Sequence, residues 1–231
     1  MSCYKIFDDK NVKKNIKKAV IFAGGDIDKD FADKIMQNNS FDLIIAADSG
    51  LDTINILGVF PDYIVGDFDS VSDRSLISAY EKRGSKVLKF PEDKDFTDTQ
   101  LACETAVEQG VSHLVILGAT GNRIDHMLCN FNLIAKLNER NVEGVIIDKS
   151  NKIYVLSDGE HLIEAKNVFG EYISFMPIDD IEEFSLSGFL YNLDKVYLAR
   201  DTTLTISNEL LNEKAGINIK KGRILVIESK N

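Results

Sequence analysis

The 231-residue sequence is poor in the residues that cross-link or interrupt small proteins. It has no tryptophan, 3 prolines, 3 cysteines and 3 histidines. The cysteines (Cys3, Cys103 and Cys129) are odd in number and show no CxxC spacing. They therefore indicate reduced thiols in a cytoplasmic protein and argue against a disulfide framework or a zinc site. The histidines show no metal-ligand spacing, and no proline-rich linker is present.

Positive charge is also scarce. Lys and Arg number 27 against 37 Asp and Glu, which gives a net charge of −10. This balance argues against a nucleic-acid or anionic-membrane partner, because both require clustered Lys and Arg. No apolar run approaches the roughly 20 residues that a membrane span needs. An acidic protein can still bind polyanionic phosphates when metal ions lie between the two.

The first part of the chain, residues 1–148, alternates short apolar runs with helix-length amphipathic stretches. Nearly continuous apolar runs are typical of strands buried on both faces of a parallel sheet. The alternation predicts an α/β domain with an open, mostly parallel sheet and helices on both faces. The predicted strands are 19–23, 43–47, 63–65, 86–90, 114–117 and 145–147.

Two of the intervening stretches carry helix signals. Thr97 and Gln100 have the spacing of a capping box, which predicts a helix start at this point. In the next helix, apolar residues recur at helical spacing, which places them on one face. These residues are Ile124, Leu128, Phe131 and Ala135.

The second part, residues 149–231, has a different texture. Short alternating runs with polar breaks are typical of an all-β sandwich or small barrel. We therefore predict a β-sandwich domain after the α/β domain. The predicted strands are 152–156, 172–176, 196–199, 202–206 and 217–228, the last of them broken at 220–222.

A pair of aspartates follows the predicted strand at 63–65. Asp67 and Asp69 are two residues apart, so in extended backbone both carboxylates point to the same side. Ligands bind at the carboxyl ends of strands in open α/β sheets, and Mg²⁺ prefers carboxylate oxygens. The pair predicts a magnesium site, although a loop whose aspartates cap the next helix would explain it as well.

A second acidic cluster strengthens the metal interpretation. Asp93, Asp95 and Asp98 follow the predicted strand at 86–90, and Asp48 ends another strand. Helix capping accounts for one such carboxylate but not for all of them. Clustered carboxylates repel one another unless a divalent cation neutralises them.

Two glycine-bearing loops follow predicted strands as well. One contains Gly24 and Gly25; the other runs from Gly118 to Gly121 and is followed by Arg123. Backbone N–H groups in such a loop can bind an anion, and the Arg123 guanidinium suits a phosphate. A plain turn explains the glycines equally well, and neither loop matches the P-loop or the dinucleotide-binding fingerprint.

In the second domain, three residues interrupt the strands in a way that suggests a ring-binding site. Tyr191 could stack on a flat ring, and Ser207 with Asn208 could hydrogen-bond it. Ordinary strand-end and turn chemistry is the alternative for each of them.

Together these motifs resemble the thiamine pyrophosphokinase (thiamin diphosphokinase) family. The resemblance covers nearly the whole chain after about residue 18, with the motifs in the family's order. The motifs are Ala23-Gly-Gly25, Asp48-Ser-Gly50, Gly66-Asp-Phe-Asp-Ser70, Asp95-Phe-Thr-Asp98, Gly121-Asn-Arg-Ile-Asp-His126, Ser187-Gly-Phe-Leu-Tyr191 and Ser207-Asn-Glu209.

The resemblance implies a reaction and an assembly. The reaction is ATP + thiamine → AMP + thiamine diphosphate, with Mg²⁺ as the cofactor. The assembly is a cytoplasmic homodimer in which thiamine lies between one subunit's α/β domain and its partner's β domain. ATP and thiamine are thus the expected partners, with no nucleic acid and no membrane.

The resemblance also implies roles for individual residues, with Asp98, Asp69 and Arg123 as the catalytic set. The sequence departs from the family at Asn122, where a second glycine is common, and at Tyr191, where some members have tryptophan. The expected metal ligands are Asp67, Asp69, Asp98 and Asp95; the nucleotide-binding residues are Asp48, Gly25, Gly121, Asn122, Arg123 and Asp125; the thiamine-binding residues are Thr97, Tyr191, Ser207 and Asn208.

The expected mechanism is attack of the thiamine hydroxyl on the β-phosphorus of ATP, with AMP as the leaving group. Such transfer depends on positioning and charge neutralisation. Asp98 is the candidate acceptor of the hydroxyl proton. Two alternatives stay open: a metal-dependent nucleotide pyrophosphohydrolase, in which water replaces the alcohol, and a nucleotide-binding module without turnover.

Overall fold

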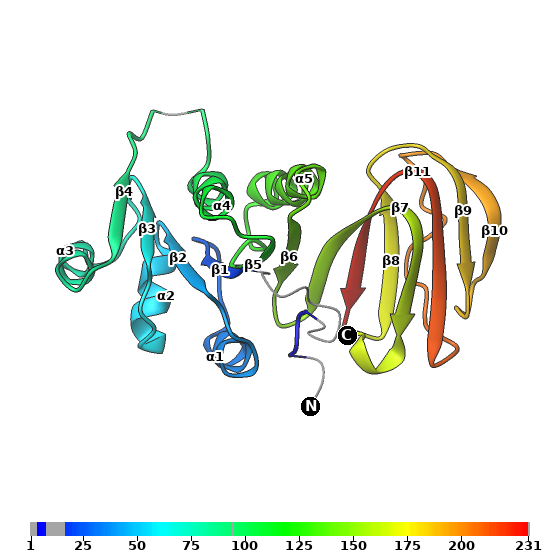
Figure 1. The fold of residues 1–231 in the computed structure, drawn as a ribbon, viewed down its shortest axis with the longest axis horizontal. Helices are drawn as coiled ribbons and strands as arrows, with labels where there is room; N and C mark the ends of the chain where they lie inside the picture. Colours follow the sequence, from blue (N-terminus) through cyan, green and yellow to red (C-terminus); the bar gives the residue numbers. More distant parts are fainter. Residues whose placement is uncertain (1–3, 8–16, 94, 231) are drawn as a thin grey trace. The chain divides into compact units, whose positions relative to one another are not determined.

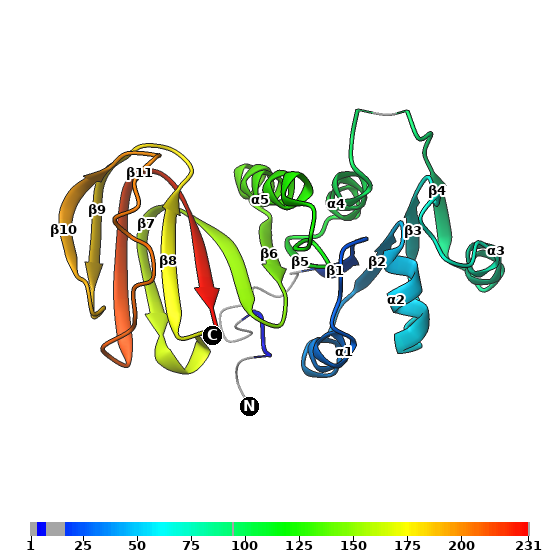
Figure 2. The same cartoon turned by 180° about the vertical axis from the view of Figure 1, so that it is seen from behind.

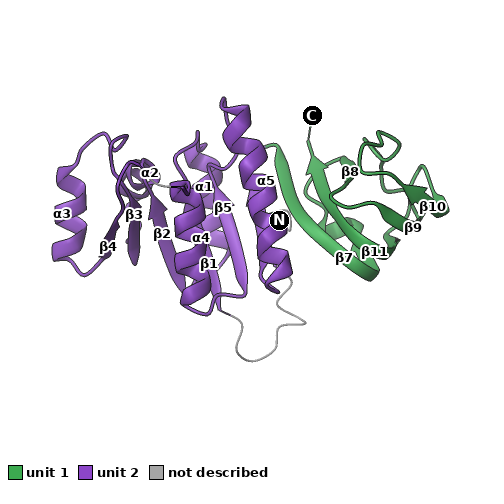
Figure 3. Cartoon of the chain, turned by 90° about the horizontal axis from the view of Figure 1, so that it is seen from above, with its two compact units in different colours: residues 1–6, 150–231 green, residues 7–149 purple. Residues whose placement is uncertain are grey.

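The computed structural model describes residues 4–7, 17–93 and 95–230. The chain divides into two compact units, which Figure 3 shows in different colours. The α/β unit runs from Phe7 to Lys149, and the β unit begins at Ser150 and takes in residues 4–6 as well. The sequence-based division at 148/149 assigned residues 4–6 to the α/β domain, whereas the structure groups them with the β unit.

The α/β unit is built on a wholly parallel sheet of six strands in the order β6-β5-β1-β2-β3-β4 (Figure 1). The predicted parallel α/β sheet is thus confirmed. Its central residues, such as Ile21, Ile45 and Ile116, are fully buried. The strands are β1 (Lys18–Phe22), β2 (Leu43–Ala47), β3 (Tyr63–Gly66), β4 (Lys86–Lys89), β5 (His113–Leu117) and β6 (Glu143–Ile147).

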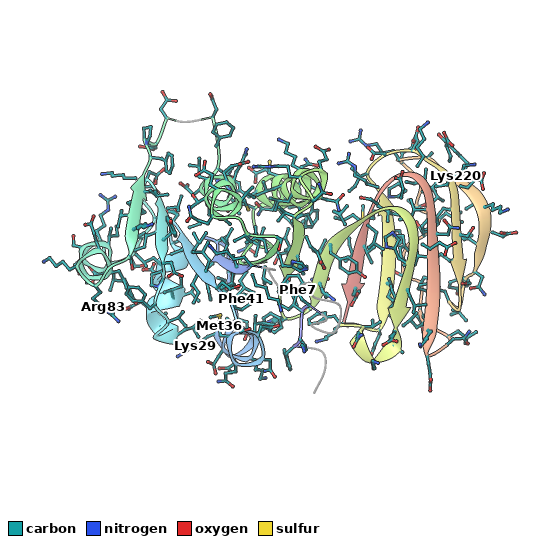
Figure 4. The ribbon with its side chains drawn as sticks, viewed as in Figure 1. Phe7, Lys29, Met36, Phe41, Arg83 and Lys220 are labelled. Carbon is teal, nitrogen blue, oxygen red and sulfur yellow. The ribbon has the colours of Figure 1, made fainter. Side chains whose placement is uncertain are left out.

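Helices cover both faces of this sheet. Figures 1 and 2 show α1 and α2 on one face and α4 with α5 on the other, and the side chains in Figure 4 fill the space between these layers. As predicted, Thr97 is the N-cap of α4, and its hydroxyl oxygen accepts a hydrogen bond from the Gln100 N–H at 3.2 Å. The helices are α1 (Lys29–Asn38), α2 (Gly50–Leu57), α3 (Ser75–Lys82), α4 (Asp98–Glu108) and α5 (Ile124–Glu139).

The strand order places a switch point at the centre of the sheet. From β1 the chain moves to β2, β3 and β4 on one side, then returns to β5 on the other side of β1. The helices that follow β1 and β5 therefore lie on opposite faces of the sheet, and the carboxyl edge at such a point is where open α/β sheets bind ligands.

The β unit is organised around its longest strand, β11 (Lys214–Ser229). This strand pairs antiparallel with β7, while its first half pairs with β9 and its second half with β8. Phe175, Phe184 and Phe189 meet in the core, with ring centroids 5.5–5.6 Å apart. The other elements are β7 (Asn151–Glu164), the 3₁₀ helix η2 (Ala165–Asn167), β8 (Tyr172–Pro177), β9 (Ile181–Ser187) and β10 (Leu193–Leu198).

The structure confirms an all-β second part but corrects its strands. No strand forms at 202–206; there the Phe175 N–H donates to the Thr205 carbonyl oxygen at 2.9 Å, and the Thr205 hydroxyl donates to the Phe175 carbonyl oxygen. A strand that was not predicted, β9, forms at Ile181–Ser187. The predicted break at 220–222 is a register shift within the continuous β11, because Lys221 and Gly222 adopt positive φ angles of 59° and 120°.

The predicted apolar face of α5 is wrong in part. Ile124 and Leu128 are 65% and 53% exposed. The buried residues of this helix are Asn130, Leu133, Ile134, Ala135 and Leu137. None of the helices in the described ranges combines the length and apolar character that crossing a bilayer requires.

Candidate active site

Three carboxylates converge at the carboxyl edge of the parallel sheet. Asp48 follows β2, and Asp67 and Asp69 follow β3; one oxygen from each lies within 4.8 Å of the others. The convergence results from strand pairing, because Ala47 is in register with Val65 in the adjacent strand. The predicted pair Asp67 and Asp69 is thus brought together with Asp48, which the sequence placed among the nucleotide-binding residues.

Local backbone geometry directs these side chains. The Asp48 N–H donates to the Val65 carbonyl oxygen at 2.9 Å, and Asp48 itself has a φ of 50°. After β3, Gly66 has a φ of 150° and Phe68 a φ of 67°. Phe68 is 4% exposed, so its buried ring anchors the turn between the two aspartates. The Asp69 N–H donates to Asp67 Oδ1 at 3.1 Å.

Asp48 is the electrostatic centre of the cluster. Burial raises the pKa of its carboxyl, and repulsion from Asp98 and Asp67 raises it further, whereas a hydrogen bond from the Ser70 hydroxyl lowers it. That bond uses Oδ2. Oδ1 is buried and has no hydrogen-bond partner in the described part of the chain. A buried orphan oxygen among mutually repelling carboxylates is a site where a hard divalent cation fits.

The second acidic stretch contributes one residue to this region. Asp98 is the first residue of α4, and its Oδ1 lies 3.2 Å from the position that a Cβ on Gly66 would take. Among the described residues, Asp95 is exposed and belongs neither to the three-carboxylate cluster nor to the lining of the adjoining pocket. The roles predicted for Asp95 and Asp98 stay predictions.

The two glycine loops lie against each other across the switch point. The Gly25 N–H donates to the Gly118 carbonyl oxygen at 3.0 Å, and the Ala23 N–H donates to that of Leu117 at 2.8 Å. A Cβ on Gly25 would lie 2.3 Å from the Gly118 oxygen, so only glycine permits this approach. Gly121 has open space around it, with the Asp26 nitrogen 3.9 Å from its hypothetical Cβ.

Arg123 and Asp125, both predicted to bind nucleotide, are bound to each other. The Arg123 Nη2 lies 2.6 Å from Asp125 Oδ2, and its Nε lies 3.3 Å from Oδ1. The pairing raises the pKa of the guanidinium and lowers the pKa of the carboxyl. Both side chains are exposed, at 69% and 64%, so the pair can exchange partners at little cost.

A cavity of about 660 Å³ joins the acidic cluster to the glycine loops. It also brings in residues that the sequence analysis missed. Asn130, for instance, donates from Nδ2 to the Ala119 carbonyl oxygen at 2.8 Å, and its i+4 spacing from His126 could have indicated it. The predicted residues in the lining are Gly25, Asp48, Asp67, Asp69, Thr97, Asp98, Gly121, Asn122 and Arg123; the missed ones include Asp26, Ser70, Thr120, His126, Met127 and Asn130.

The three predicted ring-binding residues of the β unit lie close together. Tyr191 is 64% exposed and Asn208 is 4% exposed. Ser207 has a φ of 57°, and its N–H donates to the Ser174 hydroxyl oxygen at 2.9 Å. The Asn208 amide contacts the backbone of Tyr191. Their predicted contact with thiamine stays a prediction.

The fold and the pocket place the chain among α/β proteins that bind ligands at the carboxyl edge of a parallel sheet. Two family models narrow the class: "Thiamin pyrophosphokinase, catalytic domain" matches residues 34–146, and "Thiamin pyrophosphokinase, vitamin B1 binding domain" matches residues 160–224. The thiamine pyrophosphokinase of Bacillus subtilis (strain 168) is 36% identical over 188 residues, covering 81% of this chain and 87% of the relative.

Solved structures of similar proteins support the same family assignment. The crystal structure of the Bacillus subtilis thiamine pyrophosphokinase matches with a TM-score of 0.81 at 33% identity, covering 93% of this chain and 100% of that one. The Geobacillus thermodenitrificans thiamin pyrophosphokinase matches with a TM-score of 0.79 at 28% identity, covering 93% and 98%. The chain belongs to the thiamin pyrophosphokinase family and is an enzyme of that type, as its motifs predicted.

Proposed function

We propose that this protein transfers a diphosphate group from ATP to the hydroxyl of thiamine, giving AMP and thiamine diphosphate. The observation that carries the proposal is the convergence of Asp48, Asp67 and Asp69 beside the glycine loops and Arg123 in one pocket. Carboxylates that bind a cation, next to a loop and an arginine suited to phosphate, form the pattern that phosphoryl transfer requires.

Asp67 and Asp69 would hold Mg²⁺, and Asp48 would join them through its orphan Oδ1. The bound ion would supply neutralisation of phosphate charge and orientation of the phosphate oxygens. The support lies in the donor set itself: all three groups are carboxylates. Burial, together with repulsion from Asp98 and Asp67, raises the pKa of the Asp48 carboxyl, and a bound cation would offset that repulsion. Asp98, which lies at the same edge of the sheet, is proposed as a further Mg²⁺ ligand.

The remaining chain residues position the reactants. Backbone N–H groups of the loop at Gly121 and Asn122 would bind phosphate oxygens. The Arg123 guanidinium would release Asp125 and bind a phosphate oxygen that becomes more negative during transfer. The thiamine hydroxyl forms a bond to the β-phosphorus as the bond to the AMP oxygen breaks. We propose that Asp98 accepts the hydroxyl proton.

Thiamine is proposed to contact Thr97 on the α/β unit and Tyr191 and Ser207 on the β unit of a partner subunit. The support for a homodimer is the family resemblance together with exposed apolar side chains on the β unit, including Leu204, which is 62% exposed, and Leu211, which is 67% exposed. A cytoplasmic location is proposed on the cysteines: Cys103 and Cys129 are free thiols, and Cys3 lies outside the described residues.

The decisive experiment measures AMP formation from ATP with and without thiamine. We expect AMP only when thiamine and Mg²⁺ are both present. Asp69→Asn should lower turnover by roughly 100-fold or more, because charge stabilisation by a metal is worth several kcal/mol. Asp33→Asn, which removes an exposed carboxylate on α1, is the matched control and should leave turnover unchanged.

Each alternative has its own outcome. AMP formed without thiamine would favour a pyrophosphohydrolase, and ATP bound without AMP formation would favour a binding module. Near-normal turnover of Asp69→Asn at limiting Mg²⁺ would contradict the proposal that Asp69 binds the metal. Equal calorimetric affinity for ATP with Mg²⁺ and with EDTA would do the same.

A mixing experiment tests the shared site. Asp69→Asn and Tyr191→Ala impair different units of the chain, so a mixed dimer would keep one intact site. Random mixing of two inactive variants should restore about a quarter of wild-type activity. No recovery, in a sample shown by light scattering to contain exchanged dimers, would contradict a site shared between subunits.

A further inference from the structure

The loop that follows β5, residues 118–123, is held in shape by contacts from other elements. It lies outside regular secondary structure, so no helix or strand dictates its backbone. The Gly118 carbonyl oxygen accepts a hydrogen bond from the Gly25 N–H at 3.0 Å. The Ala119 carbonyl oxygen accepts one from Asn130 Nδ2 at 2.8 Å. Two consecutive carbonyl oxygens are therefore fixed by partners on different elements, the loop after β1 and the helix α5.

The backbone N–H groups of this loop are left for a ligand. Within the described residues, none of the N–H groups of residues 119–123 donates a hydrogen bond. All five residues line the cavity that joins the acidic cluster to the glycine loops. Backbone N–H groups are strong donors that need partners, and a run of them along one loop is an arrangement that binds anions. The direction of these N–H groups therefore matters for the phosphate.

The direction of each N–H group follows from the carbonyl group before it. A peptide group is planar and trans, so the carbonyl oxygen of one residue and the N–H of the next point in opposite directions. The Gly25 contact therefore sets the direction of the Ala119 N–H, and the Asn130 contact sets that of the Thr120 N–H. The first contact joins two backbone groups and does not depend on a side chain, whereas the second depends on the side chain of Asn130.

Asn130 is the polar residue on the buried face of α5. Its side chain is buried, and its one hydrogen bond within the described residues goes to the loop. Burying an amide costs free energy unless the amide is hydrogen-bonded, and a leucine would pack at this position without that cost. The amide therefore contributes a contact to the loop more than it contributes packing to the core. The other buried residues of the helix are Leu133, Ile134, Ala135 and Leu137.

We propose that Asn130 is a positioning residue for phosphate binding. Its amide fixes the Ala119–Thr120 peptide and so holds the N–H groups of residues 120–122 in the arrangement that binds phosphate oxygens. The inference rests on the proposed function, which assigns this loop to the phosphates of ATP. The Thr120 hydroxyl donates to Asp148 Oδ2 at 2.7 Å, so the Thr120 side chain is held from the end of β6 while its N–H is directed from α5. Without the Asn130 amide, the peptide between these contacts is free to rotate.

Calorimetry of the full-length protein with inorganic tripolyphosphate and Mg²⁺ tests this role without requiring turnover. Asn130→Leu removes the donor at similar volume and adds no charge, so it should weaken tripolyphosphate by roughly tenfold, or about 1.4 kcal/mol. In steady-state kinetics it should raise the KM for ATP by a similar factor and change the KM for thiamine by less than about twofold. Asn130→Gln keeps the donor on a longer side chain and should recover part of the affinity. Asn130→Ala, which needs no extra space, takes the place of the leucine variant if that variant does not fold.

Asn39→Leu is the matched control. Asn39 Nδ2 donates to the Ile35 carbonyl oxygen at 2.9 Å, so the same kind of hydrogen bond is lost from a half-buried asparagine. Asn39 is the C-cap of α1 and does not line the cavity. This variant should have a lower melting temperature but wild-type affinity for tripolyphosphate.

The outcomes separate this inference from the proposed function. An Asn130→Leu variant that is destabilised but binds tripolyphosphate like the wild type would overturn the inference, because the amide would then support only the fold. Equal increases in the KM values for ATP and thiamine, or no recovery in Asn130→Gln, would overturn it as well. If one of these results occurs while the wild type converts ATP and thiamine to AMP, the proposed function stands. If the wild type binds tripolyphosphate through Asn130 but forms no AMP, the proposed function fails and the positioning role stands. A wild type that binds neither tripolyphosphate nor ATP overturns both.

Discussion

The side-chain amide of Asn208 forms hydrogen bonds with both the backbone N–H and the backbone carbonyl oxygen of Tyr191. Asn208 Oδ1 accepts from the Tyr191 N–H at 3.0 Å, and Nδ2 donates to the Tyr191 carbonyl oxygen at 2.8 Å. Oδ1 also accepts from the Glu209 N–H at 2.9 Å. The buried amide thus positions an exposed aromatic ring from a segment 17 residues away.

Removing this amide should affect stability and thiamine binding together. Asn208→Ala removes the three hydrogen bonds of a side chain that is 4% exposed, which costs about 1–3 kcal/mol. It should also raise the KM for thiamine more than that for ATP, because Tyr191 loses its support. Asn208→Asp keeps the acceptor and should lie between. Thermal unfolding and steady-state kinetics measure both effects, with the exposed Asn132→Ala as the control. An unchanged melting temperature for Asn208→Ala would contradict the structural role.

Two glycines in the predicted nucleotide set should respond differently to alanine. Gly25→Ala would place a Cβ 2.3 Å from one carbonyl oxygen and 2.9 Å from another, so we expect a loss of about 1–3 kcal/mol from overpacking. Gly121→Ala has open space and should fold with wild-type stability. Denaturant unfolding without ligands compares the two variants. Equal stabilities would show that the loops move apart readily.

Arg123 should not be replaceable by lysine. Lysine keeps the charge but not the planar fork that now binds both oxygens of Asp125 and suits phosphate. We expect Arg123→Lys to lower kcat/KM for ATP by roughly 10- to 100-fold, the equivalent of one hydrogen bond to a charged group. Arg83→Lys is the control, because Arg83, labelled in Figure 4, lies at the C-terminal end of α3, 5.2 Å from the Phe60 ring centroid, and does not line the pocket. Wild-type kinetics for Arg123→Lys would show that Arg123 contributes only its positive charge and not the geometry of its guanidinium.

The repulsion at Asp48 predicts a trade between stability and metal binding. Asp48→Asn removes a partly buried charge that Asp67 and Asp98 repel, so the metal-free protein should gain up to about 1 kcal/mol after solvent screening, or about 2–4 °C in melting temperature. Mg²⁺ should stabilise the wild type and have little effect on the variant. Melting curves in EDTA and in Mg²⁺ test this. A variant less stable than wild type in EDTA would show that the Ser70 hydrogen bond outweighs the repulsion.

In the β unit, a paired carboxylate predicts a defined pH dependence. The Arg223 side chain binds Asp179 with Nε–Oδ2 and Nη2–Oδ1 distances of 2.8 and 3.1 Å, and this contact lowers the pKa of the carboxyl. The folded state therefore holds the proton less tightly than the unfolded chain, whose Asp titrates near pH ~3.9. The stabilisation is present above that value and is lost as the pH falls through the lowered pKa.

The corresponding variant is Asp179→Asn. Because the pair is partly exposed, we expect a cost of about 0.5–1 kcal/mol at neutral pH that disappears in acid. Urea unfolding of both proteins across the acid range measures the difference. A difference that stays constant with pH would mean that the carboxylate charge contributes nothing.

Sequence patterns predicted much of the α/β unit because they are local. The apolar runs at 19–23 and 43–47 correspond to β1 and β2 within a residue at each end, since a strand buried on both faces needs apolar residues throughout. The patterns failed where burial depends on distant segments. The apolar spacing in α5 identified the helix but not the face that packs on the sheet, where Asn130 is buried and Leu128 is exposed.

By itself, the sequence determined the family, the order of strands and helices in the α/β unit, the Thr97 cap and the same-side geometry of Asp67 and Asp69, because each depends on a few neighbouring residues. Only the tertiary structure decided that Asp48 joins that pair and that Arg123 is bound to Asp125. The physical reason is that these relationships are set by which strands pair and in what register, and pairing energies are summed over the whole sheet.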